Sequence, residues 1–331
     1  MSKKYDVYGL GNALVDLEFK VNDQFLYDHK VKKGLMTLVD EDTQFRLIGA
    51  INQADLVRKS GGSAANSIIA VSQFGGSSFY SCKVSNDDYG DFYLKDMNEA
   101  GVDTNLDSQP REAGITGKCL VMITPDAERT MNTFLGATTD LSVKEVDERA
   151  IKDSQYVYIE GYLTPSNSGV EAMKLAKKIA EENGVKTSIT LSDPSIVQAF
   201  KGQFEEVIGA SVDLLFCNED EAMMYTGKDN LEEARQALKK EAKQFAITMG
   251  KNGAMIYDGD TFIDIEPYGV KAVDTNGAGD MFAGAFLYGI TNGMSMAAAG
   301  KLASLASSKV VSQFGPRLKT HEVQRLLHDL K

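Results

Sequence analysis

Ala272-Val273-Asp274-Thr275-Asn276-Gly277-Ala278-Gly279-Asp280 is the stretch that decides the fold. Just before its glycines, residues 268–273 alternate apolar and polar side chains, which predicts a β-strand. After it, residues 281–290 (MFAGAFLYGI) are apolar on nearly every side, as in a buried helix. The glycines in between predict a tight bend. This part of the chain is therefore expected to run strand, bend, helix.

The start of such a helix carries backbone amides that have no partner within the helix, and the helix dipole makes this end positive. Gly277 and Gly279 would let a bound group come close to the backbone. The pattern suits a phosphate and the charge that builds up during its transfer. Asp280 would then accept the proton of a substrate hydroxyl as it attacks the γ-phosphorus of ATP. The alternative is an N-cap carboxylate that ends a glycine turn.

Composition and charge restrict the partners. The chain has 331 residues with 43% hydrophobic content, enough for one large domain with an elaboration. Its formal net charge is −12 and its pI is about 4.9, and the basic residues are scattered along the sequence. This balance disfavours a broad surface for nucleic acid or for an anionic membrane. A small-molecule substrate is expected.

The cysteines and the chain start point to the cytoplasm. Cys82, Cys119 and Cys217 are odd in number, far apart and without metal-ligand spacing, which fits reduced thiols in the core. No apolar stretch resembles a signal segment or reaches the ~20 residues of a membrane span. The sequence predicts a soluble cytoplasmic protein.

Strand-like and helix-like segments alternate along most of the chain. Strands are predicted over 5–10, 77–83, 156–159, 186–191 and 212–217, and helices over 63–74, 87–100 and 166–183. Repeated β-α units predict an α/β fold with a doubly wound, mostly parallel sheet that helices cover on both faces. Ligands of such sheets bind at the carboxyl ends of the strands.

Two segments interrupt this alternation, residues 17–40 and 115–135. The second predicts a hairpin, because two alternating β-rich runs flank Pro125-Asp126-Ala127-Glu128. Together the two segments would form a small separate sheet. As a flap over the strand ends it would exclude water from a phosphoryl donor. A peripheral hairpin with no gating role is the alternative.

Residues near the N-terminus suit a polyol. Gly61-Gly62-Ser63-Ala64-Ala65-Asn66 places two glycines at a helix start and Asn66 about one turn in, where amides and a carboxamide can meet hydroxyl groups. Asp16 offers a carboxylate that can accept two neighbouring hydroxyls, as in a ribose diol. A turn cap is the other interpretation of Asp16.

Two later motifs suit a nucleotide. Asn218-Glu219-Asp220-Glu221 follows a strand, and its spacing would let Asn218 and Glu221 organise the waters of Mg²⁺ around phosphates. A capping box, with Asn218 as N-cap and Glu221 at N3, explains the same spacing. Thr248-Met249-Gly250-Lys251-Asn252-Gly253 follows another strand and would bring a turn close to ATP phosphates, although any tight hairpin looks similar.

In this order, GGSAAN (61–66), NEDE (218–221), TMGKNG (248–253) and DTNGAGD (274–280) resemble successive motifs of the ribokinase-like, or PfkB, carbohydrate kinase family. The resemblance covers essentially the whole chain. It implies ATP and Mg²⁺, Asp280 as the base, and Gly277, Ala278 and Gly279 as an anion hole. It also implies a site for a monovalent cation such as K⁺ near Asp274 and the loop before Gly315.

The family fold implied by this resemblance is ribokinase-like, with two parts. The large α/β domain, which binds ATP and substrate, would comprise residues 1–16, 46–111 and 139–331. A small β lid would comprise residues 17–45 and 112–138.

Within the family the chain is most similar to the adenosine kinase branch. Gly11-Asn12-Ala13-Leu14-Val15-Asp16 fits the branch's N-terminal pattern, in which the Asn and the Asp contact the nucleoside. Asn276 stands where many sugar kinases carry Thr. Arg129 falls where the branch carries a lid arginine that approaches the transferred phosphate, and a solvated hairpin arginine is the alternative. The ATP site implied by the resemblance consists of Asn218, Glu221, Thr248, Gly250, Gly253 and Asn276.

The resemblance also implies a base pocket. Tyr162 sits where the branch carries an aromatic side chain that stacks on the base, and Met36 and Leu38 would line the same pocket from the lid. Gln313-Phe314-Gly315-Pro316 departs from the sugar kinase pattern where the cation would bind.

The predicted function is the transfer of the γ-phosphate of ATP to the 5′-hydroxyl of a ribonucleoside, adenosine by preference. Asp16, Asn66 and the Gly61-Gly62 turn would hold the ribose. Inosine or guanosine, or a free sugar such as ribose or fructose, remain alternative substrates. A nucleoside-binding sensor without catalysis is the alternative outside the enzymes. The sequence leaves open a monomer or a homodimer.

Overall fold

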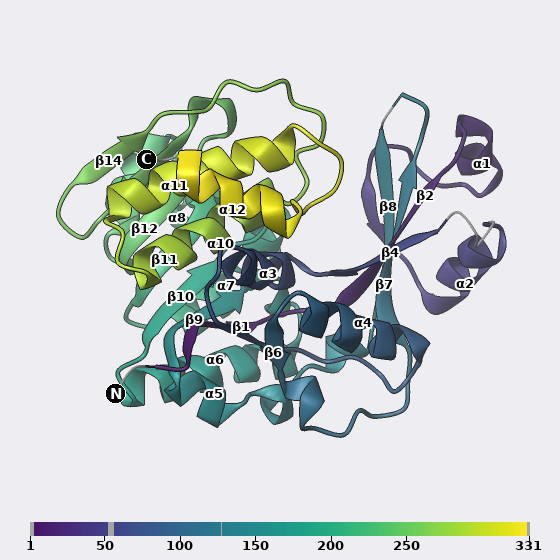
Figure 1. The fold of residues 1–331 in the computed structure, drawn as a ribbon, viewed down its shortest axis with the longest axis horizontal. Helices are drawn as coiled ribbons and strands as arrows, with labels where there is room; N and C mark the ends of the chain where they lie inside the picture. The colour runs from purple at the N-terminus through teal and green to yellow at the C-terminus, as the bar shows by residue number, and fades with distance from the viewer. Residues whose placement is uncertain (1–2, 52–55, 127, 330–331) are drawn as a thin grey trace.

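The computed structural model describes residues 3–51, 56–126 and 128–329. These residues form a nine-stranded sheet with the order β14-β13-β12-β11-β10-β9-β1-β5-β6 and a five-stranded sheet with the order β3-β8-β7-β2-β4. The small sheet stands to one side of the large one, with α1 and α2 at its outer end (Figure 1). We call the small sheet with these two helices the lid.

The strands of the large sheet are β1 (Tyr5–Leu10), β5 (Ser78–Ser81), β6 (Val102–Thr104), β9 (Ser154–Glu160), β10 (Lys186–Thr190), β11 (Val212–Asn218), β12 (Ala242–Thr248), β13 (Ala254–Tyr257) and β14 (Phe262–Ile265). The strands of the lid are β2 (Leu14–Lys20), β3 (Met36–Leu38), β4 (Val57–Gly61), β7 (Thr116–Ile123) and β8 (Arg129–Gly136).

The helices of the lid are α1 (Asp23–Asp28) and α2 (Glu41–Gly49). The remaining helices are α3 (Ser63–Gln73), α4 (Asp88–Glu99), α5 (Glu148–Lys152), α6 (Asn167–Glu182), α7 (Pro194–Ile208), α8 (Glu219–Thr226), α9 (Leu231–Leu238), α10 (Ala278–Thr291), α11 (Met296–Val311) and α12 (Thr320–Asp329).

The large sheet is the predicted doubly wound, mostly parallel α/β sheet. Strands β6 through β12 in the sheet order pair in parallel, and β13 and β14 add an antiparallel edge. Helices α3, α10, α11 and α12 cover one face, and α5 to α9 cover the other. The central strands are apolar along most of their length because helices bury both faces. This architecture was correctly predicted from the alternation of segments.

The lid contains the predicted hairpin, in which β7 and β8 are antiparallel. Its turn was predicted at residues 125–128, of which Ala127 lies outside the described residues. The lid sheet also contains residues 14–16 and 57–61, which the predicted boundaries give to the large domain. These extensions arise because β2 and β4 pair with each other up to Leu14 and Gly61, where the chain enters and leaves the lid.

One predicted strand is wrong. Residues 268–273 form no strand and lie in an exposed loop between β14 and α10. The segment instead lines a cavity beside the helix start, through Tyr268, Gly269, Val270 and Ala272. The helix after the bend is present as α10. The order at this place is therefore loop, bend, helix.

Among the helices of the described residues, none combines the length and apolar composition that crossing a lipid bilayer requires.

Candidate active site

Asp280 lies in the first turn of α10 and faces the start of α3. Its Oδ1 accepts a hydrogen bond from Ser63 Oγ at 2.6 Å, and its Oδ2 accepts one from Asn66 Nδ2 at 3.0 Å. Burial raises the pKa of Asp280 to about 6, although both hydrogen bonds favour the charged form. A carboxylate with a pKa near the working pH is suited to take up a proton and release it again.

The amides beside Asp280 are open, as predicted. Within the described residues, the N–H groups of Gly277 and Gly279 have no acceptor, and that of Ala278 makes only a 3.3 Å contact with Thr275 O. Gly277 has a φ of 76°, and a Cβ atom there would overlap the backbone of Pro316. This position therefore requires glycine, and the helix start can receive an anion.

Asp16 and Asn66 offer acceptor atoms that the protein leaves free. Asp16 is half-buried on β2, and no hydrogen bond to its carboxylate forms within the described residues. Burial raises its pKa to about 7, against the opposing charges of Arg317 and Lys59. A Cβ atom on Gly61 would overlap the Asp16 carboxylate, so this close approach depends on glycine. Asn66 Oδ1 is buried and has no partner in the described residues. Both atoms can accept hydroxyl donors.

Asn12 was predicted to contact substrate, but protein groups occupy its side chain. Its Nδ2 donates to Glu160 Oε1 at 3.0 Å, and its Oδ1 accepts from Thr138 Oγ1 at 3.0 Å. Gly62 has a φ of 110°, and a Cβ atom there would overlap the carbonyl oxygen of Asn12. These contacts make Asn12 part of the framework behind the site, and its contact with a substrate stays a prediction.

Met36 and Leu38 lie on β3, with exposed fractions of 53% and 60%. The register places Leu38 beside Thr133, Thr133 beside Cys119, and Cys119 beside Asp16. Neighbouring residues across a sheet point to the same face. The lid thus presents an apolar end and an acidic end on one face. Leu38 and Thr133 line a cavity of about 620 Å³ at the lid's edge.

Tyr162 follows β9 in a single turn of 3-10 helix, η5 (Gly161–Leu163). Its ring is half-buried, and its carbonyl oxygen accepts a hydrogen bond from Asn12 Nδ2 at 3.3 Å. Burial raises the pKa of its hydroxyl well above the ordinary value, and the carboxylate of Asp193 adds to the shift. The side chain is therefore a neutral aromatic near the acidic residues of the site.

A second cavity, of about 470 Å³, opens beside the start of α10. Thr248, Gly250, Gly253 and Gly279 line it, and so does the loop at Tyr268. Gly253 has a φ of 87°, and a Cβ atom there would overlap Ile265 O, so the turn after β12 depends on glycine. The predicted nucleotide turn and the open helix amides thus share one cavity.

Asn218 and Glu221 form the capping box that was the alternative prediction. Glu221 N donates to Asn218 Oδ1 at 2.8 Å, and Asn218 N donates to Glu221 Oε2 at 3.0 Å. The pKa of Glu221 is raised to about 7, first by burial and then by the charges of Asp193 and Asp220. A cation near these three acids would relieve that repulsion, so a magnesium ion held through water still fits.

Arg129 connects the lid to the large domain. Its guanidinium lies 3.3 Å from Glu18 Oε1 and 3.1 Å from Asp274 Oδ2, and all three side chains are at most 13% exposed. Asp274 also accepts hydrogen bonds from the amides of Asn276 and Gly315. With these partners the Asp274 carboxylate does not fit a monovalent cation in this conformation. The predicted alternative of a solvated arginine is wrong for Arg129, because the ion pairs bury it.

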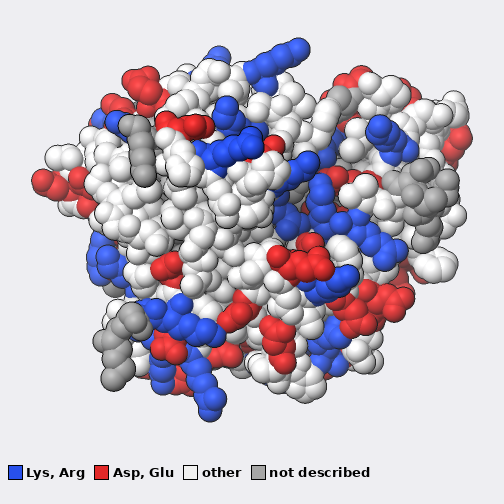
Figure 2. Space-filling view, in the orientation of Figure 1, with Lys and Arg blue, Asp and Glu red and all other residues white. Residues whose placement is uncertain are grey.

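Lys and Arg side chains gather where the lid meets the large domain on the face seen in Figure 2, with Asp and Glu side chains beside them. Arg317, Lys59 and Arg129 are the cations near enough to lower the pKa of Asp16. Each of these cations pairs with an acid, Arg317 with Asp96, Lys59 with Glu18, and Arg129 with Glu18 and Asp274, so the acids offset their charge.

The family model for the pfkB family carbohydrate kinases matches residues 29–322 of this chain. The chain belongs to this family. It is accordingly a phosphotransferase that acts on an alcohol group.

Its relatives include two kinds of kinase. The crystal structure of a probable sugar kinase protein from Rhizobium etli CFN 42 is 35% identical, with 99% of this chain and 100% of that chain covered and a TM-score of 0.88. The adenosine kinase from Sinorhizobium meliloti is 32% identical with the same coverage and TM-score. Adenosine kinase 2 of Arabidopsis thaliana is 27% identical over 341 residues, which cover 95% of this chain and 96% of that protein.

Three side chains near this pfkB-family site were not predicted from the sequence. Ser63 donates a hydrogen bond to Asp280, Glu160 accepts one from Asn12, and the charge of Asp193 raises the pKa of Glu221. Glu160 carried a signal, since it is an acidic residue directly after the buried run 156–159, at the carboxyl end of a strand. Ser63 and Asp193 look like ordinary helix-start residues, and only the fold brings them to the site.

Proposed function

We propose that this chain transfers the γ-phosphate of ATP to the 5′-hydroxyl of a ribonucleoside, adenosine by preference. One observation carries the proposal: a carboxylate at an open helix start stands beside an acceptor atom that the protein leaves unpaired. Asp280 is that carboxylate, and Asn66 Oδ1 is that atom. A buried acceptor without a partner costs about 1–3 kcal/mol, which a hydroxyl donor from a substrate would offset.

The chain's own residues suggest the order of events. Asp16 and Asn66 accept hydrogen bonds from the ribose hydroxyls and thereby orient the 5′-hydroxyl toward Asp280. Asp280 takes the proton of that hydroxyl as its oxygen attacks the γ-phosphorus, and ADP leaves. The amides of Gly277, Ala278 and Gly279 stabilise the charge on the transferred group. Arg129, if it leaves Asp274, can reach the same charge from the lid.

ATP and Mg²⁺ belong to this proposal. The cavity at Thr248, Gly250 and Gly253 would hold the nucleotide, and its phosphates would lie at the open amides of α10. Asn276 and Asn218 neighbour two of its lining residues, Thr275 along the chain and Thr248 across the sheet. Glu221 would hold Mg²⁺ through water, because its capping box occupies both carboxylate oxygens. Bound Mg²⁺ would neutralise phosphate charge in the transition state.

A monovalent cation at Asp274 is a separate proposal, because it needs a rearrangement of the site. K⁺ would have to replace the guanidinium of Arg129, which lies 3.1 Å from Asp274 Oδ2. An assay in which tetramethylammonium replaces K⁺ tests this. A higher kcat/KM with K⁺ supports a cation at Asp274, and equal rates exclude a requirement for it.

A nucleoside is favoured over a free sugar because of what surrounds the polar groups. Met36 and Leu38 are exposed on the lid face that carries Asp16, and Tyr162 offers a half-buried ring. The flat aromatic face of a base would cover these side chains, whereas ribose or fructose would leave them in water. The same surroundings accept inosine or guanosine.

A substrate panel tests the choice. Adenosine, inosine, guanosine, ribose and fructose are each supplied with ATP and Mg²⁺, and ADP release is measured. We expect the highest kcat/KM for adenosine. A free sugar with the highest value would replace the nucleoside in the proposal and leave the family assignment intact.

Asp280→Asn separates the kinase from a nucleoside-binding sensor. The amide keeps the size of the side chain but accepts no proton, so nucleoside affinity should persist while kcat falls on the order of 10² to 10⁴-fold. Isothermal titration and a steady-state assay give the two quantities. Unchanged turnover would remove Asp280 from its role.

A further inference from the structure

Glu160 is a buried acid that the reaction above does not use. It ends β9, is 1% exposed, and forms no ion pair with any cation in the described residues. Three N–H donors converge on it instead. Asn12 N and Ala64 N donate to Oε2 at 3.2 and 3.0 Å, and Asn12 Nδ2 donates to Oε1 at 3.0 Å.

One of these donors belongs to α3, the helix whose side chains donate hydrogen bonds to Asp280. Ala64 is the second residue of α3, whose N-cap is Gly62, a residue with no side chain to bond the first amides. Glu160 supplies this cap from the end of β9, and its negative charge also suits the positive end of the helix. The same first turns of α3 carry Ser63 and Asn66, the two hydrogen-bond donors to Asp280.

The other donors belong to the chain crossing into the lid. Asn12 lies between β1 of the large sheet and β2 of the lid, and its Oδ1 accepts from Thr138 at the crossing that follows β8. Thr138 Oγ1 accepts in turn from Ala13 N at 3.1 Å. Ala64 follows the third crossing, at Gly61-Gly62. Glu160 and Asn12 therefore connect three of the places where the chain passes between the two parts.

We propose that Glu160 is a positioning residue, which fixes the start of α3 against the lid crossings and so places Ser63 and Asn66 around Asp280. It does not touch the substrate, because it is covered on all sides. The proposal rests on Asp280 being the base of the proposed function.

A carboxylate is the group that this position requires. Three donors converge, and an ionised carboxylate only accepts. Glutamine can accept from the two amides with its oxygen, but its Nε2 then meets Asn12 Nδ2, donor against donor. Asn12 cannot reverse its side chain without losing the hydrogen bond from Thr138. Glu160→Gln therefore disturbs the hydrogen bonds with almost no change of volume.

The test is steady-state kinetics of Glu160→Gln in the full chain. We expect kcat to fall on the order of 10- to 100-fold, the scale of a small misplacement of reacting groups. The dissociation constant of ATP should change less than about threefold, because the nucleotide cavity touches none of these residues. A kcat within about twofold of the native chain would overturn the proposal.

A second variant reverses the hydrogen bond polarity. When Glu160→Gln is combined with Asn12→Asp, the introduced glutamine amide donates to the introduced carboxylate, which still accepts from Thr138, and the net charge is unchanged. The carboxylate cannot replace the hydrogen bond from Asn12 Nδ2 to Tyr162 O, so recovery should be partial. We expect a kcat at least about threefold above that of Glu160→Gln alone. No recovery overturns the proposal. Should the single variant fail to fold, the folded double variant decides: a kcat within about tenfold of the native chain supports positioning, and a larger loss opposes it.

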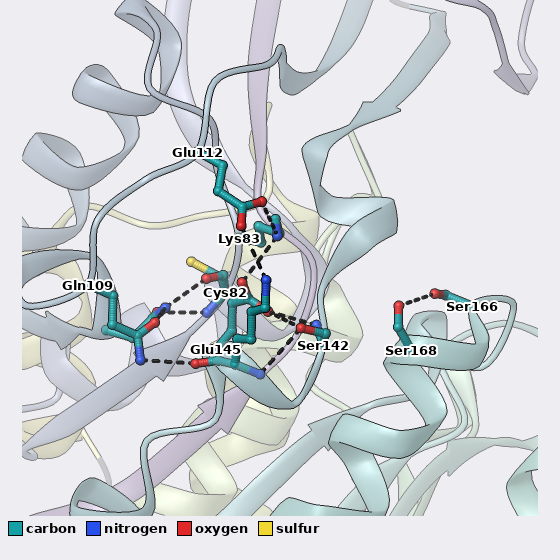
Figure 3. Close-up of polar contacts among 10 residues, drawn as sticks. Cys82, Lys83, Gln109, Glu112, Ser142, Glu145, Ser166 and Ser168 are labelled. Atoms are coloured by element: carbon teal, nitrogen blue, oxygen red, sulfur yellow. Dashed lines mark hydrogen bonds and ion pairs between the residues drawn. The ribbon is translucent and has the colours of Figure 1, made fainter.

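Glu145→Gln is the matched control. Glu145 is also a buried glutamate, 8% exposed, but it caps a turn through Ser142 and pairs with Lys83 (Figure 3). Within the described residues it forms no hydrogen bond with Asn12, Ala64 or Asp280. It should lower the melting temperature and leave kcat as it is. An equal loss of kcat would mean that any buried glutamate matters and would overturn the proposal. Asp280→Asn keeps the two claims apart: full activity there ends the proposed function, whereas a slow Asp280→Asn with a fast Glu160→Gln ends this inference alone.

Discussion

At the scale of single residues, burial controls the charges of this site. The pKa values of four acids are raised, that of Asp280 to about 6 and those of Asp16, Glu160 and Glu221 to about 7. In each case burial is the largest cause, since it disfavours the charged form. The pKa values of these acids thus lie at about 6 or 7, so that near neutral pH a small change in contacts alters their protonation.

This setting predicts the pH dependence of catalysis. A base must be deprotonated to act, so kcat/KM should rise as pH increases through the pKa of Asp280, about 6, and then level off. Ser63→Ala removes a donor that stabilises the carboxylate, so it should move the rise to higher pH. Rate profiles of both proteins from about pH 5 to 9 check this. A rise that stays in place in Ser63→Ala would assign it to another of the four acids.

At the scale of elements, the start of α10 depends on one glycine for its shape and on another for its openness. Gly277 has a left-handed φ of 76°, and a Cβ atom there would overlap Pro316. Gly279 has no atom within 4 Å of where its Cβ would stand. The two glycines look alike in the sequence, but the backbone conformation and the contact with Pro316 require only Gly277 to be glycine.

Paired substitutions test that difference. Gly277→Ala should lower both the melting temperature and kcat, because the helix start or the loop at Pro316 must move. Gly279→Ala should keep or raise stability, by up to about 1 kcal/mol, since alanine suits a helix better than glycine. Its methyl group would nevertheless stand where phosphates approach, so kcat/KM for ATP should fall. Thermal unfolding and kinetics measure both. Native kinetics in Gly279→Ala would place the phosphates elsewhere.

At the scale of the whole molecule, one buried ion pair joins the lid to the large domain. Arg129 pairs with Glu18 within the lid and with Asp274 across the cleft. Among the residues that the structure describes, Lys59 pairs with Glu18 alone, at 3.3 Å, and its side chain is 36% exposed. Removing one partner of a buried pair is costly, whereas a partly exposed pair contributes little.

Arg129→Gln should therefore loosen the lid as well as slow the reaction. We expect faster hydrogen exchange in β7 and β8 and a fall in kcat on the order of 10²-fold or more, because the lid would lose its charge at the phosphate. Lys59→Gln is the control, with little change in either quantity. Native exchange rates in Arg129→Gln would show that packing, and not this ion pair, holds the lid.

The sequence by itself determined the α/β class and the hairpin of the lid, because periodicity and turn residues are local properties of the chain. It also singled out Asp16, Asn66 and Asp280, whose roles stay proposals. It predicted a strand at 268–273 wrongly, since a short alternation of apolar and polar residues does not decide whether the segment pairs with another strand. For Glu221 the sequence left two alternatives open, a residue of a helix capping box and a residue that organises the waters of Mg²⁺. The capping box is present in the structure.

Only the tertiary structure decided which side chains meet. Three of its contacts join segments that are far apart in the sequence: Glu160 with Asn12, Ser63 with Asp280, and Arg129 with Asp274. No pattern within one segment encodes such a contact, because it depends on how strands and helices from distant parts of the chain stack on one another. The chemical groups of this site are visible in short stretches of sequence, and their geometry exists only in the folded chain.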